Sequence, residues 1–261
     1  MGACEAGYIR PRIRGTMRRS AYRNAVVLAL FLAFTFAGTA RAELVVSLYG
    51  GKAVAHDADV KLDQPGGTHL TFNDVSWDDE SFQSPLYYGA RLGYWWESAP
   101  HWGVALDYTH AKMIAPLGQT VTVSGTRNGV PVQPREPLSA TFDNLNISHG
   151  HNLLTLNLLY RWQHLGEGLV DRLQPYLGIG AGVAIPHVEV ATAGGNTEEY
   201  QVAGPAYQAL CGVDFRVYGP VSLFLEYKVS YADLDMDLSG GGRLEVEPWT
   251  SHFIFGVSCH F

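Results

Sequence analysis

The C-terminal segment, residues 249–261, constrains the fold of this chain most strongly. Along it Trp249, Phe253, Phe255 and Val257 lie on one face, polar or small residues occupy most of the other, and the segment ends on Phe261. Strict alternation of this kind is typical of strands in outer-membrane β-barrels, because lipid-facing and lumen-facing side chains alternate. The edge strand of a soluble β-sandwich is the alternative that this segment alone leaves open.

Seven further segments show the same two-residue period. They are residues 44–51, 85–96, 102–110, 153–162, 175–186, 206–217 and 221–231. These segments are 8 to 12 residues long, close to the about 9–11 residues that a transmembrane β-strand needs. The sequence therefore predicts an all-β fold, an eight-stranded antiparallel transmembrane β-barrel with long extracellular loops.

The connections between these segments alternate in length. Short connections lie at 97–101, 163–174 and 218–220, and long polar ones at 52–84, 111–152, 187–205 and 232–248. Transmembrane barrels have short periplasmic turns and longer extracellular loops, and carry aromatic residues at the membrane interfaces. The aromatic residues expected at the periplasmic interface are Tyr94, Trp95, Trp96, Trp102, Tyr160 and Trp162. A soluble sandwich predicts neither feature, so the transmembrane barrel is favoured, with both termini in the periplasm.

The N-terminus reads as an export signal. Arg18, Arg19 and Arg23 precede an uncharged run at 25–37, and a small-residue cleavage site ends at Ala42. This pattern predicts a signal peptide over 1–42 and a barrel over 43–261, in the outer membrane of a Gram-negative bacterium. Thirteen apolar residues are too few for a transmembrane helix, which needs about 20.

Removal of residues 1–42 makes the chain strongly acidic. That segment holds seven of the 18 Lys and Arg and one of the 25 Asp and Glu, which leaves 11 basic and 24 acidic residues and a net charge of −13. Such a charge argues against nucleic acid as a partner. The expected partners are outer-membrane lipid, lipopolysaccharide and the barrel assembly machinery. Cys211 and Cys259 are expected to face lipid on non-adjacent strands, without a disulfide.

Charged residues are predicted to fill the lumen, because an eight-stranded barrel has room for side chains and not for an open channel. The inward face of the predicted strands carries Arg91, Asp107, Arg161, Asp214, Arg216, Glu226 and Lys228. Charges away from water must be paired, so we interpret these residues as a network that plugs the lumen. A proton relay or gated pore through the same groups is the functional alternative.

Three stretches resemble a known family. Residues 77–96, 102–112 and 175–189, within a chain similar to small eight-stranded barrels of the OmpA type, resemble the lipid A oxidase family. The resemblance covers most of 43–261 and concerns strand patterns, not a catalytic motif. It implies oxygen-dependent conversion of the proximal glucosamine of lipid A to 2-aminogluconate, with molecular oxygen as co-substrate.

An enzyme acting on lipid A needs its polar groups at the extracellular ends of the strands. The candidate catalytic residues there are His110, His151 and His187, with Lys112 and Glu189 as candidate substrate-binding residues. His149, beside His151, is a further histidine at this end, and histidines with nearby carboxylates could hold a divalent transition metal. The sequence does not identify the metal.

Other chemistry is not indicated by the sequence. No hydrolase elbow, nucleotide-binding loop or H-E-x-x-H zinc motif occurs. Two functions stay open, a lipid A oxidase and a non-enzymatic outer-membrane barrel whose surface loops bind partners.

Overall fold

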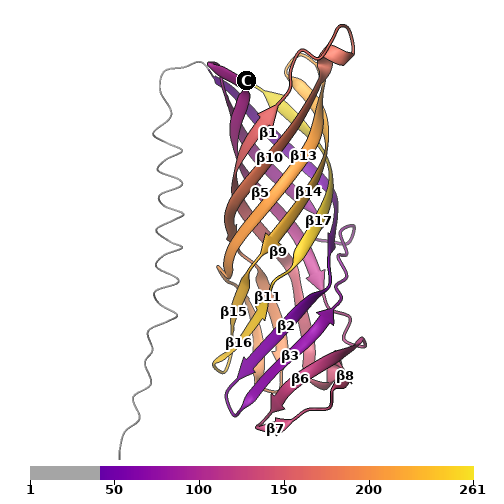
Figure 1. The fold of residues 1–261 in the computed structure, drawn as a ribbon, viewed down its shortest axis with the longest axis vertical. Coiled ribbons are helices and arrows are strands. Elements are labelled where there is room, and N and C mark those ends of the chain that lie inside the picture. The colour runs from indigo at the N-terminus through magenta and orange to yellow at the C-terminus, as the bar shows by residue number, and fades with distance from the viewer. Residues whose placement is uncertain (1–41) are drawn as a thin grey trace, which may run out of the picture. The chain divides into compact units, whose positions relative to one another are not determined.

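The computed structural model describes residues 42–261, and the predicted signal peptide lies outside them, apart from its last residue. Eight antiparallel strands form a closed barrel (Figure 1). In chain order they are β1 (Ala42–Ala55), β4 (Tyr88–Trp96), β5 (Ala99–Ile114), β9 (Phe142–Arg161), β10 (Leu173–Ala184), β13 (Gly204–Tyr218), β14 (Val221–Ala232) and β17 (Trp249–His260). Each pairs with its neighbours in the order β10, β13, β14, β17, β1, β4, β5, β9, and β9 pairs with β10 to close the ring.

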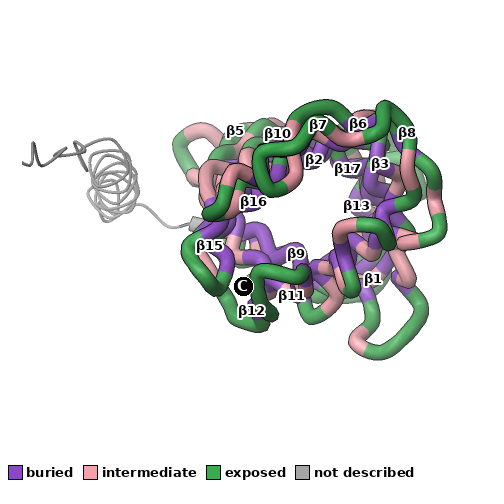
Figure 2. The backbone as a smooth tube through the Cα atoms, turned by 90° about the horizontal axis from the view of Figure 1, so that it is seen from below, coloured by how far each residue is buried: buried purple, intermediate pink, exposed green. Residues whose placement is uncertain are grey.

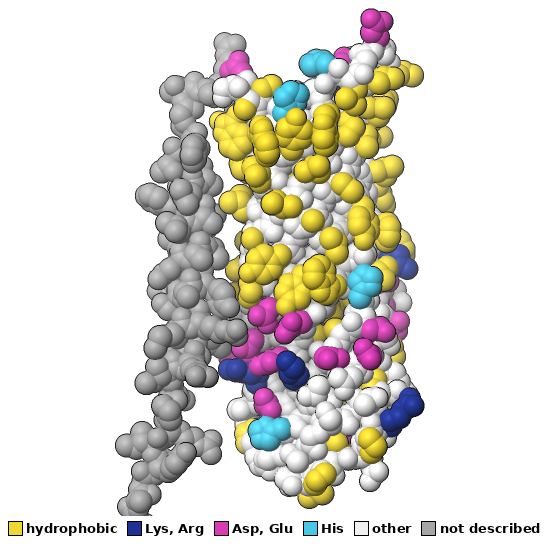
Figure 3. All heavy atoms as spheres, in the orientation of Figure 1, with side chains coloured by type: hydrophobic (Ala, Val, Ile, Leu, Met, Phe, Trp, Pro, Cys, Tyr) yellow, Lys and Arg dark blue, Asp and Glu magenta, His cyan; other side chains and the backbone are white. Residues whose placement is uncertain are grey.

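The barrel wall follows the alternation seen in the sequence. Along β14, residues from Val221 to Lys228 alternate between exposed and buried, and β17 ends with the same pattern. On the face shown in Figure 3, exposed apolar side chains cover the upper part of the barrel, and most charged side chains lie below this apolar belt. Seen along the axis, the backbone forms a ring (Figure 2). The predicted eight-stranded transmembrane barrel is thus confirmed.

The four long connections contain further β-strands that the sequence did not predict. They contain the strands β2 (Ala58–Gln64), β3 (Thr68–Val75), β6 (Thr120–Arg127), β7 (Val130–Pro131), β8 (Arg135–Pro137), β11 (His187–Thr192), β12 (Gly195–Tyr200), β15 (Leu234–Leu238) and β16 (Gly242–Val246). A 3₁₀ turn, η1 (Leu138–Ala140), lies in the second connection. Strands β5 and β9 also continue beyond the predicted 102–110 and 153–162.

These hairpins enclose a large apolar core outside the membrane belt. Val60 and Leu62 of β2 face Leu70 and Phe72 of β3, and all four side chains are almost fully buried. Apolar residues from the other three connections join the same core. Burial of this surface explains why the connections fold into strands despite their polar composition.

The short turns and the two termini of the barrel chain lie at the end of the barrel opposite these hairpins. Leu44 and Phe261 exchange backbone hydrogen bonds of 3.1 and 2.8 Å, which joins β1 to the chain end. A second 3₁₀ turn, η2 (Val170–Arg172), lies in the 163–174 connection.

Trp95 was expected at the membrane interface, and this was wrong. Its ring is buried in the lumen beneath the Arg161 guanidinium, 4.2 Å from the ring centroid.

Candidate functional site

Four charged side chains form a network at the centre of the lumen. Arg91 donates two hydrogen bonds to Glu226, at 2.6 and 2.8 Å, and one of 3.1 Å to Asp107. Lys228, with a fully buried side chain, donates to Asp107 at 2.7 Å and to Thr109 at 2.9 Å. The two cations and the two carboxylates give the network a net charge of zero. Each charge is therefore paired although it is buried away from water.

A second network lies at the periplasmic end of the lumen. Arg161 and Arg216 both donate to the carboxylate of Glu43, and His260 Nδ1 lies 2.7 Å from the same group. Asp214 accepts a 2.6 Å hydrogen bond from Ser222. The seven lumen residues expected from the sequence therefore divide into two networks. Glu43 was missed because it directly follows the predicted cleavage site, at the very start of its strand.

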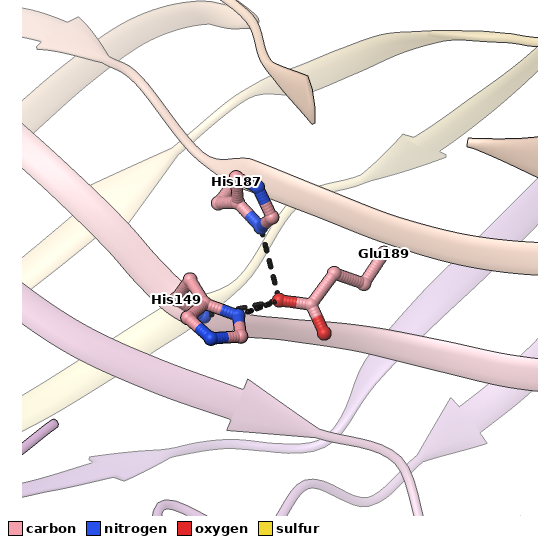
Figure 4. A group of neighbouring side chains, drawn as sticks. All are labelled: His149, His187 and Glu189. Carbon is pink, nitrogen blue, oxygen red and sulfur yellow. Dashed lines mark hydrogen bonds and ion pairs between the residues drawn. The ribbon is translucent and has the colours of Figure 1, made fainter. Parts of the chain in front are cut away.

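His149, His187 and Glu189 converge on the outer wall, at the extracellular end of the barrel (Figure 4). His187 Nδ1 lies 2.9 Å from Glu189 Oε1, and His149 Nδ1 contacts the same oxygen. The potential ligand atoms of the three side chains all lie within 4.8 Å of one another. His149 is the most exposed, with 58 % of its side chain accessible against 13 % for each of the others. Two imidazoles and one carboxylate with an open side make a donor set suited to a transition metal.

Local backbone geometry brings these three side chains together. On β11, Val188 and Val190 enter the apolar core, so His187 and Glu189 face outward. On β9, a bulge at Gly150, whose φ is +135°, separates two registers with β5 and turns His149 outward. Pairing of β11 with β9 then sets the two histidines side by side, with ring centroids 5.1 Å apart.

Hydrogen bonds keep Glu189 ionised. Burial by itself would raise the pKa of this carboxyl, but hydrogen bonds from His149, Ser148 and His187 outweigh it and leave the pKa below its usual value. Ser148 Oγ lies 2.8 Å from each carboxylate oxygen. An ionised carboxylate beside two imidazoles is ready to ligate a cation.

The structure separates two of the other predicted site residues, His151 and Lys112, from this cluster. His151 points into the barrel, is almost fully buried, and has no hydrogen-bond partner for either ring nitrogen within residues 42–261. Lys112 is also buried, and its Nζ donates to the Gln83 carbonyl at 3.0 Å and lies 3.9 Å from Glu80. His187 and Glu189 are therefore the predicted residues that meet directly.

His110 lies on the same outer wall, within a group of residues that the sequence reasoning did not single out. Its Nδ1 lies 2.9 Å from Asn152 Oδ1, and its ring stacks on Tyr88 with centroids 4.7 Å apart. Tyr108 donates a 2.9 Å hydrogen bond to the same Asn152 oxygen. The Tyr200 ring packs on His187, with ring centroids 4.5 Å apart. Only the period-two pattern of the strands could have indicated that Tyr88, Tyr108 and His110 share a face.

The closed barrel, its apolar belt and its paired lumen charges define a transmembrane β-barrel of the outer-membrane type. Among residues 42–261 no helix is long and apolar enough to cross a bilayer. Within this class, the chain carries a histidine and carboxylate cluster on its outer wall.

No protein-family model and no curated protein matches the chain. Among solved structures it is similar to Neisserial surface protein A, with 12 % identity over 85 % of this chain and 99 % of the other and a TM-score of 0.42. Outer membrane protein OprG from Pseudomonas aeruginosa shares 17 % identity over 86 % and 98 %, with a TM-score of 0.40. Ail of Yersinia pestis, in complex with the heparin analogue sucrose octasulfate, shares 14 % over 82 % and 99 %, with a TM-score of 0.31. The assignment to the barrel class follows from the strand pairing of this chain itself.

Proposed function

We propose that this barrel oxidises the proximal glucosamine of lipid A to 2-aminogluconate, with molecular oxygen as the oxidant. The convergence of His149, His187 and Glu189 on the outer wall carries the proposal. Two histidines and one carboxylate with open positions are typical of non-haem iron sites that use oxygen. The resemblance of three strand segments to the lipid A oxidase family supports the same reaction.

The position of the cluster along the barrel axis, close to the expected membrane surface, suits a lipid A substrate. Tyr88 and Tyr108 face outward at the extracellular edge of the apolar belt, and His110 is the next outward position on β5. His149 is three residues beyond Asn152, which pairs with His110, and three residues extend at most about 10 Å. The sugar of an outer-leaflet lipid lies at this boundary between hydrocarbon and water. Lipid A can therefore reach the cluster without entering the barrel.

The proposed oxidation balances with oxygen and water alone. The anomeric carbon loses its hydrogen, its hydroxyl loses a proton, and a C=O bond forms, which gives the lactone. Two electrons and two protons pass to oxygen, which becomes hydrogen peroxide. Water then breaks the ring ester, so the product gains one oxygen atom overall. A phosphate on the anomeric oxygen would block the first step, so the substrate must have that hydroxyl free.

The chain's own residues have two tasks in this reaction. His149, His187 and Glu189 would hold the metal through their Nδ1 atoms and carboxylate, and each imidazole must lose its Nδ1 proton to do so. A bound iron or copper ion would supply a site for the reduction of oxygen. Tyr200 packs on the His187 ring and donates a 3.2 Å hydrogen bond to the His149 carbonyl, so it contacts both histidine residues.

Mass spectrometry of lipid A from cells with and without the chain tests this proposal. We expect a product heavier by one oxygen atom with the wild-type chain, and its loss with His187→Ala or Glu189→Gln. His69→Ala is the matched control, because His69 is an exposed histidine paired with Asp63 on a hairpin. Heat-modifiable gel mobility checks that each variant is folded. Unchanged lipid A in every sample would favour the non-enzymatic barrel.

A further inference from the structure

The orientation of the Asn152 side chain is fixed, and it sets the tautomer of His110. Asn152 Nδ2 donates a 3.1 Å hydrogen bond to the Ile185 carbonyl, which leaves Oδ1 facing Tyr108 and His110. An amide oxygen can only accept hydrogen bonds. His110 must therefore donate from Nδ1, and in the neutral ring the lone pair lies on Nε2.

This lone pair has no partner among the residues that the structure describes. His110 Nε2 is buried and makes no hydrogen bond, and the whole side chain is only 3 % exposed. A buried acceptor without a donor costs free energy, so an unpaired one needs an explanation. Tyr88 covers the ring and is itself 47 % exposed on the outer wall. A sugar that displaces Tyr88 would reach the ring from the lipid side.

The surroundings place His110 beside the metal-ligand cluster. His149 and Lys112 are both close enough for their charges to act on His110. Tyr88 stacks on the His110 ring and Asn152 bonds to its Nδ1, and Lys112 and His149 are the nearby titratable groups whose charges act on it. The ring is thus oriented by Asn152, and its Nε2 is available to accept a proton next to a site proposed to use oxygen.

We propose that His110 is the general base of the reaction, which accepts the proton of the anomeric hydroxyl through Nε2. This inference rests on the proposed lipid A oxidation. As the hydroxyl O–H and the C–H bond break and the C=O bond forms, His110 takes the hydroxyl proton and oxygen takes the electron pair with the other hydrogen. His110 then returns its proton to the reduced oxygen, which leaves as hydrogen peroxide. Asn152 and Tyr108 are positioning residues, because they act through the imidazole.

Replacement of His110 tests the role directly with purified protein, lipid A bearing a free anomeric hydroxyl, and air. His110→Ala should lower kcat by about 10²–10⁴-fold with little change in KM, the range expected for loss of a general base. Added imidazole should restore part of the rate, which a purely structural role would not allow. His69→Ala should match the wild type. Iron binding, measured by titration, should be unchanged in His110→Ala, because the three ligands remain.

Substitution of Asn152 tests the positioning. Asn152→Asp keeps an acceptor for the Nδ1–H of His110 and should retain most of the activity. The acid limb of the plot of kcat against pH should be shifted. Asn152→Leu removes the acceptor and should lose at least about tenfold in kcat. A wild-type chain that oxidises lipid A while His110→Ala keeps its rate would overturn this inference alone. A wild-type chain that forms no product would overturn both the inference and the proposed function.

Discussion

Loss of Arg91 should destabilise the barrel more than loss of any exposed arginine. Arg91→Met removes both hydrogen bonds to Glu226, at 2.6 and 2.8 Å, and the 3.1 Å bond to Asp107. Among residues 42–261, Glu226 would then keep only the 2.8 Å hydrogen bond from Tyr176. The four-charge network would change from neutral to a net charge of −1 in a fully buried place. Breaking a buried pair in this way costs about 3–5 kcal/mol.

Urea titration of the barrel from lipid vesicles, followed by tryptophan fluorescence, would measure this free energy of unfolding. The double variant Arg91→Met with Glu226→Gln restores neutrality and should cost less, about 1–3 kcal/mol for the remaining unpaired polar groups. Arg243→Met is the matched control, because Arg243 is 45 % exposed and paired with Asp235 at 3.1 Å, and it should cost at most about 1 kcal/mol. If Arg91→Met and Arg243→Met lower the free energy of unfolding equally, the interpretation that the lumen charges are paired and shielded from water is refuted.

Three further outcomes test the membrane orientation and the site. Leu156→Arg, on the outer face of β9, should cost about 2–4 kcal/mol, whereas Val130→Arg on an exposed hairpin should cost under about 0.5 kcal/mol; similar urea midpoints would contradict the assigned facing. In a chain whose native cysteines are replaced by Ala, Asn196→Cys should react with an impermeant thiol reagent on intact cells and Ser98→Cys should not, and the reverse would invert the topology. Metal affinity should fall as the pH is lowered, because an imidazole must be free of a proton at the ligating nitrogen, while the lowered pKa of Glu189 keeps its carboxylate available; a pH-independent affinity in a competition titration would exclude the histidines as ligands.

The barrel wall could be predicted because its physical signal is local. Phe253, Phe255 and Val257 are exposed at 56, 61 and 49 %, as their alternation indicated. Each wall strand must present one face to lipid and one to the lumen, so two-residue periodicity alone sets its facing. The same rule placed Arg91 and Lys228 in the lumen.

The extracellular hairpins were missed although a weaker signal was present. Val60 and Leu62 alternate with charged residues, as do Leu234 and Met236, and these four side chains are fully buried. The polar composition of these segments suggested loops. Only the mutual packing of four connections, distant in sequence, supplies the apolar core that makes them strands.

Residue spacing could not predict that His149, His187 and Glu189 come together. His149 and His151 would share one face of a regular strand, but the positive φ at Gly150 breaks the alternation and sends the two rings to opposite sides of the wall. The pairing that brings His149 to His187 joins β9 to β11, a strand within a connection that the sequence predicts as a polar loop. The tautomer of His110 likewise depends on a carbonyl contact that no sequence pattern reports.

Oxidation of lipid A by the purified barrel is the most direct test of the central claim. The protein in detergent, supplied with iron, copper or zinc, would be mixed with lipid A bearing a free anomeric hydroxyl, under air and under argon. Mass spectrometry should show a product heavier by one oxygen atom, with equimolar hydrogen peroxide, only under air and only with Glu189 intact. No product under air with any of these metals would contradict the claim and leave a non-enzymatic outer-membrane barrel.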